Sequence, residues 1–181
     1  MKYQNHMIIR VLILLYILVI SCNEPIARKP VSSKGDSFFK ESVELNKKLN
    51  LEEDKMIKNF IKSDSLIEYI TSPNGFWYTY IFKDTLAQPS IKKGDIVHFS
   101  YEVNDFNGIN IYPQQEKRYR VDEEILIQGL QEGIKMLKAN DEALFLFPSY
   151  KAYGYLGDKK KINGRQILKY RVKINSIQSS K

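Results

Sequence analysis

The sequence predicts an α+β domain in which a curved antiparallel β-sheet wraps around one short helix, with a helical extension before it. Two observations carry this prediction. Within residues 72–181, several segments alternate apolar and polar side chains as half-buried strands do, whereas residues 122–137 have helical spacing. Turn sequences separate these segments, and antiparallel strands need only short connections. Packing the helix on one face of the sheet would bury the apolar surfaces of both.

The expected strands are short segments bounded by turns. They cover residues 76–82, 96–103, 118–121, 142–147 and 168–175. Turn sequences at 72–75 and 91–95 precede the first two, and Asn107-Gly108 marks a hairpin after the second. The side chains expected to face the core are Val97, Phe99, Tyr101, Val103, Tyr119, Val121, Leu168, Tyr170, Val172 and Ile174.

Helical spacing predicts two further elements. In the first, residues 37–71, apolar side chains recur on one helical face. They are Phe38, Leu45, Leu49, Met56 and Phe60, with Leu66, Ile67 and Ile70 continuing the pattern. The second is a short helix that Asp122 is expected to cap, with Glu123 and Glu124 in its first turn. Its apolar stripe consists of Leu126, Leu130, Ile134 and Leu137.

The N-terminus has the order of an export signal. Lys2 and Arg10 precede or flank an unbroken apolar run at 11–20, and Ser21 is small. The run is shorter than the roughly 20 residues of a membrane span, so a transmembrane anchor or a buried core helix is the less favoured alternative. The motif Val19-Ile20-Ser21-Cys22 resembles a bacterial lipobox. This resemblance implies a signal peptide at 1–21, a lipid on Cys22 and a flexible tether over 22–36.

Composition limits the classes of function. The chain has 181 residues, 43% apolar and 27% charged, which suits one folded domain with extensions. Its single cysteine excludes an intrachain disulfide, and with two histidines no metal site or cofactor is expected. The formal net charge of +7 is compatible with nucleic acids or anionic membranes. Export argues against nucleic acid, so the membrane is the expected partner.

Common catalytic signatures of nucleophiles, phosphate loops and metal ligands are missing from the sequence. Three other motifs occur in order: 94–101 (Gly-Asp-Ile-Val-His-Phe-Ser-Tyr), 128–133 (Gln-Gly-Leu-Gln-Glu-Gly) and 148–154 (Pro-Ser-Tyr-Lys-Ala-Tyr-Gly). Over residues 75–178 the chain resembles the FKBP-type peptidyl-prolyl isomerases. With the lipobox and the helical segment, it is similar to the gliding motility-associated FKBP-type lipoproteins.

The resemblance implies an isomerase domain at 72–181 with an apolar pocket for proline. Catalytic roles fall on Tyr101, on the backbone N–H of Ile127 and on the Tyr153 hydroxyl. Substrate-binding roles fall on Ile111, Leu126, Leu130, Ile162 and Tyr170. The implied partners are proline-containing exported proteins. Asn23 after the lipidated cysteine favours a place on the outer membrane, facing the periplasm.

Several positions depart from the family pattern, which keeps two alternatives open. Tyr112 replaces an Asp that helps to organise the pocket, Lys117 replaces an aromatic wall residue, and Leu130 replaces a Trp. Asp158 stands where some members have His. These departures are compatible with a catalytically weak chaperone or assembly scaffold. A structural lipoprotein, in which all the aromatics form the core, is the more remote alternative.

Overall fold

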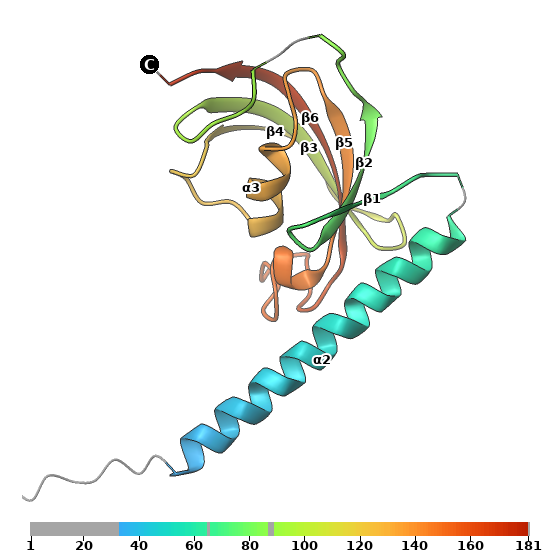
Figure 1. The fold of residues 1–181 in the computed structure, drawn as a ribbon, viewed down its shortest axis with the longest axis vertical. Helices are drawn as coiled ribbons and strands as arrows, with labels where there is room; N and C mark the ends of the chain where they lie inside the picture. The colour runs from blue at the N-terminus through green and yellow to red at the C-terminus, as the bar shows by residue number, and fades with distance from the viewer. Residues whose placement is uncertain (1–32, 65, 87–88, 181) are drawn as a thin grey trace, which may run out of the picture. The chain divides into compact units, whose positions relative to one another are not determined.

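An antiparallel sheet forms the body of the protein, as the sequence predicts, but it has a sixth strand at Ile70–Ser72, and the strand expected at 118–121 spans Asn110–Arg120. The computed structural model describes residues 33–64, 66–86 and 89–180, with side chains from residue 37 onward. The chain divides into two compact units, 1–41 and 42–181, and the second contains the sheet. The strands are β1 (Ile70–Ser72), β2 (Phe76–Phe82), β3 (Ile96–Asp105), β4 (Asn110–Arg120), β5 (Glu142–Phe147) and β6 (Leu168–Gln178). Their spatial order is β1-β2-β5-β6-β3-β4 (Figure 1).

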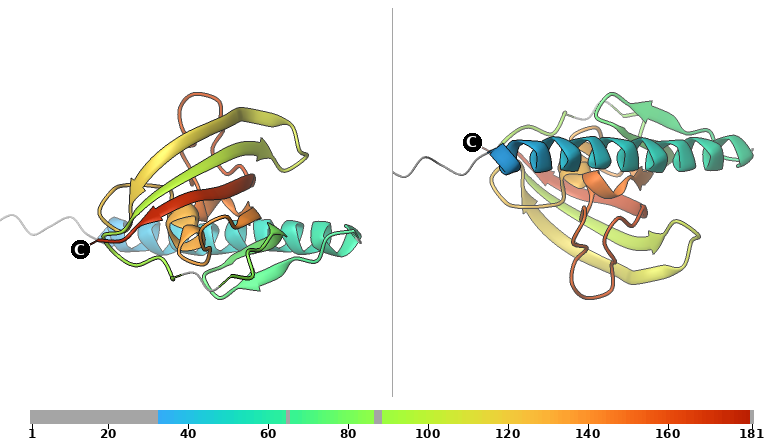
Figure 2. Two further views of the ribbon diagram at one scale, coloured as in Figure 1. Left: turned by 90° about the horizontal axis from the view of Figure 1, so that it is seen from above. Right: turned by 90° about the horizontal axis from the view of Figure 1, so that it is seen from below.

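The sheet curves around the short helix α3 (Gln128–Ile134), as Figures 1 and 2 show. Register shifts interrupt the pairing of β3 with β4 near Tyr101 and Val103, and that of β3 with β6 between His98 and Phe99. Such bulges bend a strand and increase its twist. The long central strand β3 can therefore curve with the rest of the sheet around α3.

The concave face of the sheet holds the main core. Phe145 and Phe147 of β5 stack with ring centroids 5.4 Å apart and an interplanar angle of 9°. The α3 glycines lie directly against them: a Cβ on Gly129 would be 2.6 Å from the Phe147 ring, and one on Gly133 would be 2.9 Å from Phe145. The helix packs this closely because both positions lack a side chain.

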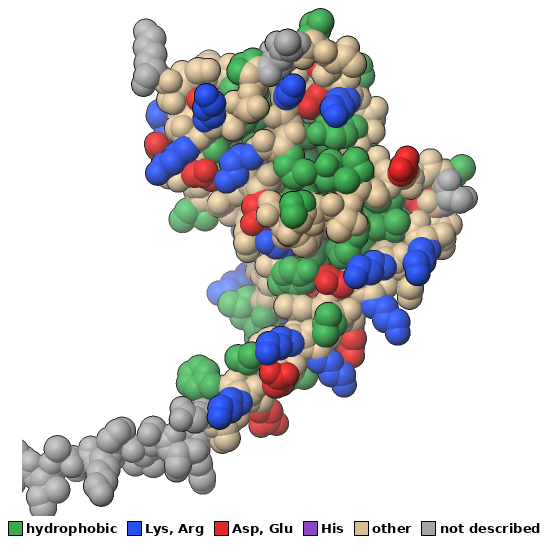
Figure 3. All heavy atoms as spheres, in the orientation of Figure 1, with side chains coloured by type: hydrophobic (Ala, Val, Ile, Leu, Met, Phe, Trp, Pro, Cys, Tyr) green, Lys and Arg blue, Asp and Glu red, His purple; other side chains and the backbone are tan. Residues whose placement is uncertain are grey.

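Within the 42–181 unit, the opposite face of the sheet is covered in part by residues 42–63 of helix α2 (Ser33–Ser63). Ile57 of this helix is fully buried in a second apolar cluster with Trp77, Leu146 and Ile167. Trp77 and Leu146 alternate along their strands with residues of the main core, so they point to the other side. Elsewhere on α2, charged side chains and exposed apolar ones are interspersed (Figure 3).

Three expectations about the helical extension are wrong: where it begins, where it ends, and its apolar face, of which Phe38, Leu45 and Met56 are exposed. The helical extension ends at Ser63 and does not reach residue 71, because residues 70–72 pair with β2 as strand β1. Leu66, which the helical pattern included, is 93% exposed. At the other end, α2 begins at Ser33, inside the tether expected over 22–36.

Asp122 does not cap α3, which begins only at Gln128. The φ angle of Asp122 is 57°, so this residue turns the chain after β4, and its carboxylate accepts a hydrogen bond from Lys135 at 2.9 Å. Ile127 stands at the N-cap position without a side-chain cap. The expected signal peptide and Cys22 lie outside the described residues. Among the described helices, none is both long and apolar enough to cross a membrane.

Candidate functional site

A hollow of about 520 Å³ opens between α3, the concave face of β3 and β6, and the loop that follows β5. Its lining consists of Tyr101, Lys117, Ile125, Leu126, Ile127, Gln128, Leu130, Ala152, Tyr153 and Tyr170. Lys117 is the one charged residue in this lining. The hollow therefore offers aromatic and aliphatic walls with a few polar groups, as pockets for small or peptide ligands commonly do.

Two of the aromatic walls come from neighbouring strands. Tyr101 of β3 and Tyr170 of β6 stack with centroids 6.0 Å apart and an interplanar angle of 16°. The Tyr101 hydroxyl donates a hydrogen bond to Gln115 at 3.2 Å. Burial, together with the neighbouring Tyr153, raises the pKa of both tyrosines. Both hydroxyls therefore stay neutral near pH 7 and remain able to donate hydrogen bonds.

Tyr153 is presented by a tight turn after β5. The 3₁₀ helix η1 (Ser149–Lys151) begins the turn, and the Ser149 carbonyl accepts hydrogen bonds from Ala152 N–H at 2.9 Å and Gly154 N–H at 2.7 Å. Gly154 has a φ of 60°, a conformation that glycine adopts without steric cost. The residues on both sides of Tyr153 are thus fixed by the same carbonyl.

Ile127 offers a backbone donor at the start of α3. Its carbonyl accepts hydrogen bonds from the N–H groups of Leu130 and Gln131, both at 3.1 Å. Within the described part of the chain, its own N–H donates to no backbone or side-chain acceptor. A ligand carbonyl in the hollow would find this donor unoccupied.

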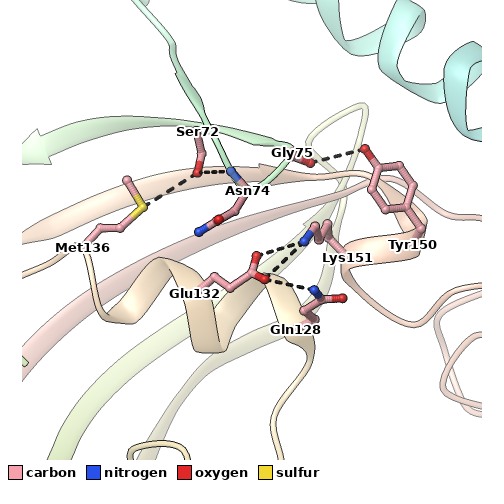
Figure 4. Close-up of polar contacts among 8 residues, drawn as sticks. All are labelled: Ser72, Asn74, Gly75, Gln128, Glu132, Met136, Tyr150 and Lys151. Carbon is pink, nitrogen blue, oxygen red and sulfur yellow. Dashed lines mark hydrogen bonds and ion pairs between the residues drawn. The ribbon is translucent and has the colours of Figure 1, made fainter. Parts of the chain in front are cut away.

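The motif at 128–133 joins α3 to the Tyr153 loop. Gln128, which lines the hollow, donates to Glu132 at 2.9 Å. Glu132 also forms an ion pair with Lys151 of η1 at 3.0 Å, as Figure 4 shows. The two glycines of the same motif allow α3 to approach the sheet, so each of its defining residues has a structural role.

A second hollow of about 480 Å³ adjoins the first and shares Tyr101 and Tyr153 with it. Tyr112 donates a short hydrogen bond there to Asp158. The other Asp158 oxygen accepts three backbone N–H groups, from Lys160 at 2.8 Å, Lys161 at 3.0 Å and Ile162 at 2.8 Å. The Asp158 carboxylate therefore stands beside the site.

This pair shifts the pKa of both partners. The hydrogen bond to Asp158 is the main cause that raises the pKa of Tyr112 to about 12. Desolvation alone would raise the pKa of Asp158, but the hydrogen bonds from Tyr112 and from the backbone outweigh it and lower the pKa to about 2. At neutral pH the pair is therefore a tyrosine hydroxyl held by an ionised carboxylate.

Six of the eight residues predicted for the site line the first hollow, and two do not. Ile162 is buried in the main core, and Ile111 packs against that core as a half-buried residue. Sequence reasoning missed Ile125, Gln128 and Ala152. Gln128 and Ala152 belong to the motifs at 128–133 and 148–154, so the sequence could have indicated that they lie at the site. The catalytic and binding roles of all these residues stay predictions.

Another hollow, of about 230 Å³, is lined largely by polar and charged residues, among them Ser100, Glu102, Glu142, Arg171 and Lys173. Arg171 already donates to Glu142 there at 2.5 Å. Since four charged side chains line it, this hollow suits an apolar ligand less well than the aromatic one. No cluster of His, Cys, Asp and Glu suited to a metal ion occurs among the described residues.

Comparison with known proteins agrees with this geometry. Residues 88–175 match the family model of the FKBP-type peptidyl-prolyl cis-trans isomerases. The fold is similar to the 1.6 Å crystal structure of a peptidyl-prolyl cis-trans isomerase from Pseudomonas syringae pv. tomato str. DC3000. The TM-score is 0.58 at 18% identity, over 70% of this chain and 94% of that one. No curated protein sequence matches the chain.

Proposed function

The chain carries an FKBP-type peptidyl-prolyl cis-trans isomerase domain, and we propose that its aromatic hollow catalyses cis–trans isomerisation of X–Pro bonds in exported proteins. The observation that carries the proposal is the convergence of Tyr101, Tyr153 and Tyr170 with the Ile127 backbone on one apolar hollow. Four separate parts of the sequence contribute to it: β3, the start of α3, the loop after β5, and β6.

The chemistry of the reaction suits such a site. Uncatalysed X–Pro isomerisation takes tens to hundreds of seconds, and the barrier of about 18–20 kcal/mol for peptide bonds arises from amide resonance. The twisted amide in the transition state has lost charge separation, so an apolar wall binds it better than the planar amide. No nucleophile, base or metal is required by this route.

Two polar groups would orient the substrate. The Tyr153 hydroxyl and the Ile127 N–H would each donate to a carbonyl beside the proline, while Leu126 and Leu130 would contact its ring. Holding the flanking carbonyls leaves the central amide free to rotate, and it removes part of the entropic cost of reaching the twisted geometry.

The sequence also supports a location for this activity. The signal at 1–21 and the lipobox around Cys22 support a lipid anchor in the cell envelope, on the outer membrane facing the periplasm. Several acyl chains would hold the protein firmly on the membrane, since each CH₂ group buried in the bilayer contributes about 0.8 kcal/mol to the free energy of binding. The closer resemblance to gliding motility lipoproteins supports a role in that machinery.

A second candidate is a chaperone or assembly scaffold with weak turnover. Two residues that line the hollow favour this second candidate. Lys117 places a charge in the wall, and Leu130 is smaller than the Trp of the family pattern. A scaffold would suppress aggregation of client proteins without accelerating steps limited by proline.

The test is isomerisation of a Leu-Pro peptide by residues 33–181, comparing the native sequence with Tyr153→Phe. A hydrogen bond of about 0.5–1.5 kcal/mol corresponds to a two- to tenfold loss of kcat/KM in the variant. Tyr155→Phe is the matched control, because Tyr155 is 75% exposed and outside the lining. Equal rates for Tyr153→Phe and the native sequence would remove Tyr153 from the site. Folded protein without any acceleration would favour the scaffold.

A further inference from the structure

A buried carboxylate outside the hollow holds the loop that carries Tyr153. Glu53 of α2 is only 7% exposed, and both of its oxygens are engaged by Ser149. One accepts the Ser149 backbone N–H at 2.7 Å and the other accepts the Ser149 hydroxyl at 2.7 Å. Hydrogen bonds to an ionised acceptor are roughly twice as strong as neutral ones.

Ser149 passes this restraint directly to the residues around Tyr153. Its carbonyl is the acceptor for the N–H groups of Ala152 and Gly154, at 2.9 and 2.7 Å. Fixing the backbone of Ser149 therefore fixes the acceptor that closes the turn on both sides of Tyr153.

A second contact from α2 reaches the far side of the same turn. The backbone N–H of Arg165 donates to the Gly154 carbonyl at 2.8 Å. Its guanidinium donates to Asn46 at 2.6 Å and lies 4.0 Å from Glu53. Asn46 and Glu53 are two helical turns apart on α2, so they share one face of the helix.

The rest of η1 is held in the same manner. The Tyr150 hydroxyl lies 2.9 Å from Asp54 of α2 and 3.4 Å from the Gly75 carbonyl, and Lys151 pairs with Glu132 (Figure 4 shows the Gly75 and Glu132 contacts). Each residue of η1 therefore contacts an acidic side chain, two of them from α2. The turn that carries Tyr153 is therefore held on one side through Ser149 and on the other through Arg165.

We propose that Glu53 is a positioning residue for isomerisation: through Ser149, it sets the turn that holds Tyr153 in the hollow. The α2 segment from Asn46 to Asp54 is then part of the working enzyme and not only a link to the N-terminus. The inference deepens the proposed function and rests on it for its catalytic readout.

The test compares Glu53→Ala and Glu53→Gln with the matched control Glu52→Gln, whose side chain is exposed. All variants are assayed well below their melting temperatures. We expect Glu53→Ala to lower kcat on a Leu-Pro peptide about tenfold, with KM changed less than twofold. We expect Glu53→Gln, which keeps neutral hydrogen bonds to Ser149, to retain intermediate activity. The control should match the native protein.

Amide hydrogen exchange supplies a readout that does not depend on catalysis. In Glu53→Ala, exchange of the Ala152 and Gly154 amides should accelerate at least tenfold, while the β6 amides keep their native rates. Should Glu53→Ala not fold, Glu53→Gln and Ser149→Ala decide by the same two readouts. Unchanged kcat and unchanged Gly154 exchange in folded variants would overturn the proposal.

The same data separate this inference from the proposed function. If the native protein does not accelerate isomerisation, the proposed function fails, and the Gly154 exchange rate alone decides whether Glu53 anchors the turn. If the native protein is active and the Glu53 variants are unaffected in both readouts, only the positioning role fails.

Discussion

At the scale of single residues, Asp158 places a carboxylate beside the two hollows and holds the Tyr112 hydroxyl. The family resemblance identified Tyr112 and Asp158 separately, as a lost Asp and a replaced His. The structure shows them as partners across 46 positions of sequence. No local pattern in one sequence indicates such a pair, because it forms only when the β3–β4 hairpin and the loop before β6 meet.

The Tyr112–Asp158 pair leads to a prediction about pH. The pKa of Asp158 is about 2 against an ordinary 3.8, so its contribution to stability is complete above about pH 3.8. That contribution is lost as the pH falls toward 2. The pKa of Tyr112, raised from 10.0 to about 12, gives a contribution present below pH 10 and lost as the pH rises toward 12.

Replacing Tyr112 by Phe isolates the side-chain part of this effect. The Asp158 pKa should then rise, yet stay below 3.8, because three backbone donors remain. Titration of the Asp158 carboxyl carbon by NMR between pH 1.5 and 6 measures the change. Tyr155→Phe, which removes an exposed hydroxyl, serves as the control. An Asp158 pKa that is the same in native protein and Tyr112→Phe would contradict the hydrogen bond.

At the scale of elements, periodicity identified the sheet well and the helix ends poorly. The strand at 168–175 carries the buried residues that alternation predicts, and so does 96–103 except that Tyr101 is half-buried and Ser100 is buried. The helical spacing at 64–71 was misleading. The helix α2 ends at Ser63, and Ile70–Ser72 pair with β2 as strand β1. The cap expected at Asp122 is likewise wrong, because that residue has a left-handed backbone in the turn after β4 and α3 begins only at Gln128.

Gly129 and Gly133 of α3 lead to a prediction about how closely the helix packs on the sheet. Gly129→Ala raises intrinsic helix propensity by about 1 kcal/mol. Its Cβ would nevertheless meet the Phe147 ring at 2.6 Å, a contact that the buried ring cannot relieve without moving. We expect a net loss of about 1–3 kcal/mol in the free energy of unfolding, typical of overpacked cores.

Gly133→Ala is the matched comparison, with a nearest approach of 2.9 Å to the Phe145 ring. Its destabilisation should be the smaller of the two. Urea unfolding followed by fluorescence of the single tryptophan, Trp77, measures both. A Gly129→Ala protein as stable as the native one would show that α3 can move away from the sheet at no cost.

At the scale of the whole molecule, the sheet of the 42–181 unit is packed on its concave face and, in part, on the opposite face by elements that the sequence places far apart. The aromatic core and α3 cover the concave face, and the C-terminal part of α2 packs on the other through Ile57. The sequence predicted the helix, but the apolar face that it predicted does not include Ile57, the residue that packs on the domain. Ile57 shares its cluster with Trp77 and Leu146, which alternate along their strands with residues of the main core, and with Ile167, which directly precedes β6.

Removing the Ile57 side chain tests whether α2 and the sheet form one cooperative unit. Ile57 is fully buried, so Ile57→Ala should lower the free energy of unfolding by about 2–5 kcal/mol. Met56→Ala is the matched control, because Met56 adjoins Ile57 in sequence but is 53% exposed, so its replacement should cost at most about 0.5 kcal/mol.

Trp77 belongs to the same cluster as Ile57 and reports on α2 docking by fluorescence, while far-UV circular dichroism reports on the whole chain. Coincident urea transitions are expected for one unit. A Trp77 transition at lower urea than the dichroism transition, or equal costs for Ile57→Ala and Met56→Ala, would show that α2 and the sheet unfold independently.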